Sequence, residues 1–135
     1  QRGIDMVLDA IDFDYTIQGA DLIITGEGKI DFQTAKGKTA AGVLARAKKQ
    51  NIPVIAIGGC VEICESVKQM GFAGIYPITE EKLPLEIAMQ AEVAAMNVEK
   101  TVKKICVCHK FSVPLQRISP KCNKLGTKLR WKIAL

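Results

Sequence analysis

The stretch Gly19-Ala-Asp-Leu-Ile-Ile-Thr-Gly-Glu-Gly-Lys-Ile-Asp-Phe-Gln-Thr-Ala-Lys-Gly-Lys38 decides the fold of this chain of 135 residues. It opens with Leu22-Ile23-Ile24, a short apolar run with the β-branched content of a buried strand. We predict that this strand ends at Thr25 and that Gly26-Glu27-Gly28 then turns tightly into a loop before a helix. In open α/β sheets, strand, glycine loop and helix build ligand sites at the carboxyl ends of the strands.

The segments around this stretch alternate between helical and strand patterns. The predicted helices cover residues 4–11, 37–50, 62–70 and 85–105, and the predicted strands cover residues 21–25, 54–57 and 75–78. Because these strands are apolar along their length, the pattern indicates an α/β fold with a parallel sheet and helices on both faces. Three such strands would leave apolar sheet edges unpaired, so we expect further strands upstream and interpret the chain as an incomplete fragment.

The net charge of +5 is distributed unevenly along the chain. Residues 1–100 hold all 14 acidic residues and 10 Lys and Arg, whereas residues 101–135 hold 9 Lys and Arg and no acidic residue. We therefore divide the chain into an α/β segment, residues 1–105, and a basic, irregular tail, residues 106–135. Pro114 and Pro120 interrupt helix in the tail, which we expect to take no place in the sheet. The sequence does not favour nucleic-acid binding by this tail, because a charge run without a recognised fold is weak evidence.

The five cysteines, at positions 60, 64, 106, 108 and 122, do not form an even disulfide framework. No signal peptide accompanies them, which favours free thiols and a cytoplasmic location. Cys106-x-Cys108-His109 resembles half of a zinc site, but no second C-x-x-C pair at standard spacing completes it. No apolar run approaches the roughly 20 residues of a transmembrane helix, so we expect no membrane partner.

Two phosphate-binding motifs are nearly matched in the central stretch. Gly37-Lys38-Thr39 ends like a P-loop, but Phe32 stands where that motif needs a glycine. Gly26-x-Gly28 begins like a dinucleotide fingerprint, but Asp31 stands at the place of its third glycine. Neither motif is therefore complete.

A loop with its own set of charges remains. Glu27, Lys29 and Asp31 could together orient a phosphoryl group, a magnesium ion and a hydroxyl nucleophile. A solvated loop whose charges pair with one another is an equally good interpretation of the spacing. Gly58-Gly59, after the second predicted strand, could offer N–H groups to an anion, although a tight turn is favoured there.

The segment Ala20-Asp21-Leu22-Ile23-Ile24-Thr25-Gly26-Glu27-Gly28-Lys29-Ile30-Asp31, with Gln33-Thr34 and Gly37-Lys38, closely resembles a family signature. This signature, A-D-L-V-I-T-G-E-G-[RK]-[LI]-D-x-Q-[ST]-x-x-G-K, is that of type 1 glycerate kinases. The helix after Gly3 and the strand around Val54 are similar to flanking segments of that family, and the likeness covers roughly residues 1–105. It implies that the chain is the C-terminal segment of a two-domain kinase that phosphorylates D-glycerate with ATP and Mg²⁺.

The resemblance, together with the chemistry of the loop, also implies roles for individual residues. Asp31, as base or hydroxyl-orienting group, and Lys29 are the expected catalytic residues. Glu27 is the candidate magnesium-side carboxylate, with loop ordering as its other role. Substrate or phosphate binding is expected of Gly26, Glu27, Gly28, Gln33, Lys38, Gly58 and Gly59. The expected partners are D-glycerate and a missing N-terminal part, and the alternative is a non-catalytic α/β remnant with at most weak anion binding.

Overall fold

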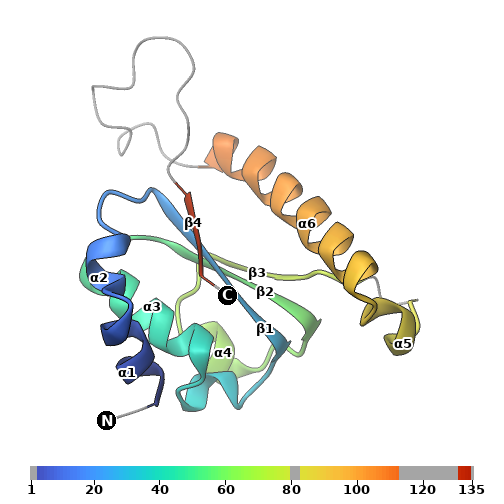
Figure 1. Cartoon of the computed structure of the whole chain (residues 1–135), viewed down its shortest axis with the longest axis horizontal. Helices are drawn as coiled ribbons and strands as arrows, with labels where there is room; N and C mark the ends of the chain where they lie inside the picture. The colour runs from blue at the N-terminus through green and yellow to red at the C-terminus, as the bar shows by residue number, and fades with distance from the viewer. Residues whose placement is uncertain (1–2, 80–82, 113–130, 135) are drawn as a thin grey trace.

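The computed structural model describes residues 3–79, 83–112 and 131–134 of the chain (Figure 1). The helices are α1 (Gly3–Ala10), α2 (Phe13–Thr16), α3 (Thr39–Lys49), α4 (Glu65–Gln69), α5 (Leu85–Ala88) and α6 (Ala91–Ser112), with one 3₁₀ turn, η1 (Thr34–Lys36). The strands are β1 (Leu22–Ile30), β2 (Val54–Val61), β3 (Gly74–Pro77) and β4 (Trp131–Ala134).

All described strands belong to one parallel sheet with the order β3-β2-β1-β4. In the β1–β2 pair, Gly26 lies opposite Ile57 and Glu27 lies opposite Gly58. The predicted adjacency of the three apolar strands is therefore confirmed. The two glycine-containing segments therefore lie side by side at the same end of the sheet.

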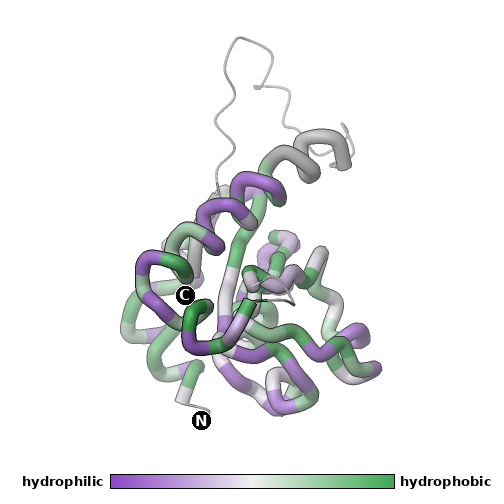
Figure 2. Tube along the Cα trace, turned by 90° about the vertical axis from the view of Figure 1, so that its right-hand side faces the viewer, coloured by the Kyte–Doolittle hydropathy of each residue, from purple (hydrophilic) through white to green (hydrophobic). Residues whose placement is uncertain are grey.

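Helices cover both faces of the sheet, which confirms the predicted α/β class (Figure 1). On one face, Ile23 and Val54 of the sheet pack with Leu8 of α1 and with Val43 and Leu44 of α3. The other face carries a second cluster, made of the buried residues Leu22, Ile24, Ile55, Ile57 and Ile105 of α6. The coloured part of α6 in Figure 2 carries both hydrophobic and hydrophilic residues, and its apolar residues Val98, Val102 and Ile105 pack against the sheet.

The N-terminal helices are held on α3 by a close approach and by ion pairs. Gly42 of α3 lies so near α1 that a Cβ built on it would fall 2.6 Å from Cγ1 of Ile4. Arg46 of α3 forms ion pairs with Asp9 of α1 and, at 2.7 Å, with Asp14 of α2. These contacts fix α1 and α2 beside α3.

The predicted ends of the first two strands are wrong. β1 continues through Gly26 and Gly28 to Ile30, and β2 continues through its two glycines to Val61. The ladder persists because the two glycine-containing segments pair with each other, with Lys29 opposite Cys60. A Cβ on Gly59 would lie 2.9 Å from the carbonyl oxygen of Gly28, so glycine at this position lets the two strands approach. Pairing between distant segments has outweighed the local turn signal.

The C-terminal third also differs from its prediction. The single helix expected over residues 85–105 is divided into α5 and α6, and α6 continues past Ile105 to Ser112. Trp131–Ala134 forms β4 and pairs with Leu22–Thr25, so the expectation that the tail takes no place in the sheet is wrong there. The charge and the prolines of the tail give no information about the backbone N–H and C=O groups at the edge of β1. An extended segment can pair with these groups, whatever the composition of the tail around it. Residues 113–130 lie outside the described residues, and the domain boundary near residue 105 stays a prediction.

Two smaller features complete the description. Gly71 lies just past the end of α4 with φ of +82°, a left-handed conformation that favours glycine at this position. Among the helices that the structure describes, none is long and apolar enough to cross a membrane.

Candidate functional site

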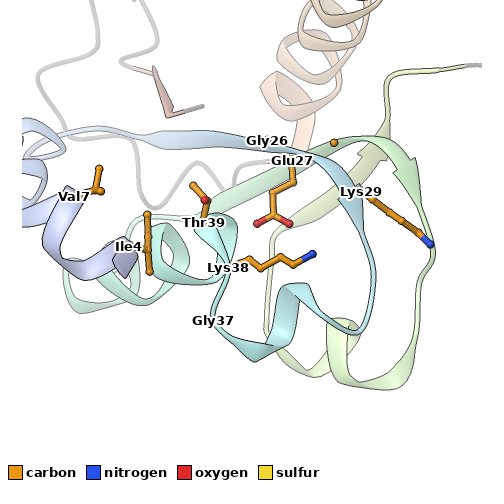
Figure 3. Close-up of a pocket in the computed structure, with 9 residues that line it drawn as sticks. Ile4, Val7, Gly26, Glu27, Lys29, Gly37, Lys38 and Thr39 are labelled. Atoms are coloured by element: carbon orange, nitrogen blue, oxygen red, sulfur yellow. The ribbon is translucent and has the colours of Figure 1, made fainter. Parts of the chain in front are cut away.

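An open cavity of about 740 Å³ lies where β1 leaves the core and α3 begins (Figure 3). Residues from α1, from the second half of β1 and from the start of α3 surround it. They are Ile4, Val7, Gly26, Glu27, Gly28, Lys29, Gly37, Lys38 and Thr39. The cavity therefore has an apolar wall from α1 and a polar, charged wall from the segment that carries the family resemblance.

Glu27 connects β1 to the loop and to α3. Its Oε1 accepts a hydrogen bond from the backbone N–H of Ala40 at 2.9 Å, and its Oε2 accepts one from the hydroxyl of Thr34 at 3.0 Å. A carboxylate in the first turn of a helix is stabilised by the helix dipole. Since each oxygen already has a protein donor, this geometry favours the loop-ordering role of Glu27 over the magnesium-side role.

Asp31 and Thr34 hold the loop from inside. Asp31 is 5% exposed, and its Oδ1 accepts a hydrogen bond from the backbone N–H of Gln33 at 2.8 Å. Thr34 is fully buried, and its hydroxyl accepts a hydrogen bond from the backbone N–H of Asp31 at 3.2 Å. The conformation of residues 31–38 is thus fixed by buried polar groups that satisfy one another.

Lys29 is engaged by two carboxylates. Its Nζ lies 2.7 Å from Oε1 of Glu62 and 3.7 Å from Oδ2 of Asp31. The hydrogen bond to Glu62 is the main reason why the pKa of Lys29 is raised above its ordinary value. In Figure 3 the side chain of Lys29 extends away from Lys38, toward β2. Lys29 therefore offsets the charge of neighbouring carboxylates at the margin of the cavity.

Lys38 is the cation placed most freely beside the cavity. It is exposed, precedes the first turn of α3, and forms no hydrogen bond or ion pair with the other described side chains. Gly37, next to it, has φ of 98°, a conformation that favours glycine. A Cβ on Gly28 would meet no atom within 4 Å, so packing does not explain the missing side chain there.

The predicted site residues separate into two groups. Gly26, Glu27, Gly28, Lys29 and Lys38 line the cavity. Four others are absent from its wall: Asp31, Gln33, Gly58 and Gly59.

Gly58 and Gly59 have a packing role in this structure. A Cβ on Gly58 would lie 3.0 Å from the carbonyl oxygen of Cys60 and 3.1 Å from the side chain of Ile30. Both glycines are part of β2 and of its ladder, not of a turn at a helix N-terminus. Neither the tight turn nor the anion-binding turn predicted at this position is therefore formed.

Two residues that support the site were missed by the sequence analysis. Thr34 could have been found from the spacing Asp31-x-x-Thr34, which resembles the reciprocal bonding of a helix cap. Glu62 could have been found only from the pairing of β1 with β2, which brings the end of β2 beside Lys29. The spacing that indicates Thr34 is local in the sequence. The position of Glu62 follows only from the register of the β1–β2 pair.

Among the side chains that the structure describes, no three His, Cys, Asp or Glu residues are grouped so that they could hold a metal ion. Cys60, Cys64 and Cys106 are free thiols. The described part of the chain therefore shows no metal centre that is complete in itself.

Comparison with known proteins connects this geometry to a family. The profile of the glycerate kinase family matches residues 1–110. Over 113 residues, the chain is 50% identical to a glycerate kinase from Bacillus cereus and 43% identical to one from Bacillus subtilis, covering 83% of this chain in each case. A crystal structure of a proposed glycerate kinase 2 from Salmonella typhimurium LT2 superposes with a TM-score of 0.61 at 32% identity and covers 88% of this chain.

The matches cover only part of the longer proteins. The chain spans 29% of the length of each of the two Bacillus relatives and 28% of the Salmonella chain. The family profile nevertheless covers most of this chain, including all of β1, the loop and α3. On this evidence, the chain belongs to the glycerate kinase family.

Proposed function

We propose that this chain is a segment of a glycerate kinase that transfers a phosphoryl group from ATP to a hydroxyl of D-glycerate. The observation that supports this most strongly is the family match, together with the gathering of residues from the signature around one cavity. The proposal extends from relatives that are much longer than this chain. The rest of such a kinase, the expected N-terminal part, is therefore a required partner.

Each charged residue of the site has a role in this proposal. Lys38 offsets the negative charge of phosphate or of the glycerate carboxylate. Oδ2 of Asp31, the oxygen that Gln33 does not use, takes the proton of the attacking hydroxyl as the new O–P bond forms and ADP leaves. Lys29, between Asp31 and Glu62, offsets the negative charge beside the reacting carboxylate. Glu27 and Thr34 hold the loop that carries Lys38.

The described residues fit ATP better than Mg²⁺, the two cofactors that the family implies. The cavity, with Lys38 and the open backbone at Gly28, has the size and charge to hold part of a nucleotide. No group of three donors in the described residues is ready for Mg²⁺. Mg²⁺ is commonly held by one or two carboxylates and by substrate phosphates, so we assign no step to it and propose that it arrives with ATP. A cytoplasmic location is also proposed, supported by the free thiols.

A chimera tests the proposal directly. Residues 1–110 replace the matching segment of the Bacillus cereus glycerate kinase, and steady-state kinetics are measured with ATP, Mg²⁺ and D-glycerate. Asp31→Asn should lower kcat by about 10²–10⁴-fold, since a positioned general base contributes that much to the rate. Asp12→Asn is the matched control, because Asp12 is exposed and Asn accepts its left-handed backbone, with φ of 48°.

Each outcome separates the interpretations. A folded chimera without activity would favour the alternative of a non-catalytic α/β remnant. An active chimera with near-normal turnover in Asp31→Asn would remove Asp31 from catalysis and leave it as the loop-holding residue that its hydrogen bonds describe.

A further inference from the structure

The cavity is larger and chemically more varied than D-glycerate requires. D-glycerate is a small acid that carries polar groups on every carbon, whereas a volume of about 740 Å³ lies in the range of pockets that take drug-sized ligands. A site for glycerate alone has no need of an apolar wall. The size of the cavity therefore points to the larger of the two substrates of the proposed reaction.

The apolar wall comes from α1. Ile4 is held against Gly42 of α3, which fixes its position at the rim. Val7 lies one helical turn further along, lines the same cavity and is 56% exposed, so much of its surface is open to a ligand. These aliphatic side chains offer contact to a flat apolar group such as a nucleobase.

The polar and charged wall of the cavity adjoins this apolar wall. Figure 3 shows Val7 and Ile4 at one side of the view, Thr39, Glu27 and Lys38 in the middle, and Lys29 at the other side. Lys29 is already paired with Glu62 and Asp31, so Lys38 is the cation that remains for an incoming anion among the described residues of the wall. A ligand that matches both walls is therefore anionic at one end and flat and apolar at the other.

We infer that this cavity binds the adenine nucleotide of the proposed kinase, with the base against Ile4 and Val7 and the polyphosphate toward Lys38. This inference rests on the proposed function and assigns to Ile4 and Val7 a role that the loop signature does not contain. D-Glycerate then binds outside the α1 end of the cavity.

Nuclear magnetic resonance on the full chain tests the assignment with two probes, ATP and inorganic tripolyphosphate. Affinities come from the shifts of backbone amide signals, and saturation transfer from protein methyl groups identifies the ATP protons in contact with the protein. Val7→Ser should lower the affinity for ATP by about fivefold, because apolar contact with the base is lost, while the affinity for tripolyphosphate stays the same. Lys38→Met should weaken the binding of both ATP and tripolyphosphate. Met6→Ser is the matched control, because Met6 is 59% exposed on the same helix but does not line the cavity.

Saturation transfer to the adenine protons, and its loss in Val7→Ser, would support the inference. It is overturned if Val7→Ser weakens both probes equally, if it weakens neither, if Met6→Ser acts like Val7→Ser, or if the folded chain binds no ATP at millimolar concentration. Failure of the proposed function would appear elsewhere, as a folded but inactive chimera. In an active chimera, an unchanged KM for ATP in Val7→Ser would reject the base contact alone.

Discussion

The two halves of β1 have different surroundings. Residues 22–25 are buried and have paired neighbours on both sides, β2 and β4. From Gly26 to Lys29 the described pairing continues with β2 alone, and the side chains become partly or largely exposed. One strand thus extends from the core into the wall of the cavity. A site built on a continuous ladder is held more rigidly than one built on a loop.

The largest effect that would sharpen this comparison is expected in the buried half. Ile24→Ala removes a fully buried side chain from the cluster that contains Ile105, and should lower the free energy of unfolding by about 2–5 kcal/mol. Ile63→Ala, just beyond the end of β2 and 55% exposed, should change it by less than about 0.5 kcal/mol. Urea unfolding followed by circular dichroism measures both. Equal losses would contradict the placement of the core.

Beside the exposed half of β1, two glycines on neighbouring strands should differ in how substitution by alanine changes the stability of the fold. Gly59→Ala places a Cβ 2.9 Å from the backbone oxygen of Gly28, which cannot rotate away, and should cost about 1–3 kcal/mol. Gly28→Ala meets no atom within 4 Å and should be neutral or stabilise by up to about 1 kcal/mol, since it restricts the unfolded chain. Thermal and urea unfolding compare the two. A destabilised Gly28→Ala together with a normal Gly59→Ala would show that the β1–β2 ladder ends before these residues.

The buried polar contacts of the loop should have a smaller effect. Thr34→Val keeps the shape of the side chain but leaves Glu27 Oε2 and the Asp31 N–H without their partner, at a cost of about 1–2 kcal/mol. Thr39→Val is the matched control, because Thr39 is exposed at the start of α3. Chemical unfolding provides the measurement. If both variants are equally stable, the loop is not held by Thr34.

The smallest effect is expected at the margin of the site. Glu62→Gln replaces the charged acceptor that raises the pKa of Lys29 by a neutral amide, so that pKa should fall toward its ordinary value of 10.5, as measured by NMR titration of the Lys29 side chain. A raised pKa in the folded state means that the pair stabilises the fold below the unfolded-state pKa and that this contribution is lost as the pH rises through the folded-state value. The wild type and Glu62→Gln should therefore differ in stability at neutral pH and converge in strong alkali. An unchanged Lys29 pKa would mean that the pair is not formed in solution.

The sequence could predict the buried half of β1 better than the exposed half for a physical reason. Leu22, Ile23 and Ile24 carry their strand signal in their own side chains, and the parallel arrangement follows from their apolar character. At Gly26 and Gly28 the local signal is a turn, while the observed strand depends on pairing with β2, which no local pattern contains. The same reason separates Thr34, whose spacing from Asp31 is readable, from Glu62, which approaches Lys29 only through the register.

The placement of β4 has a consequence for the order in which the protein folds. Glu27 reaches Thr34 and Ala40 over 7 and 13 positions of sequence, so β1, the loop and α3 can close early at low entropic cost. β4 pairs with β1 over a far longer sequence separation, with Trp131 opposite Leu22, so this pairing costs more loop-closure entropy and is expected to form later. Until β4 joins the sheet, this edge of β1 keeps unpaired N–H and C=O groups, and during that interval a chaperone or a second strand has access to it.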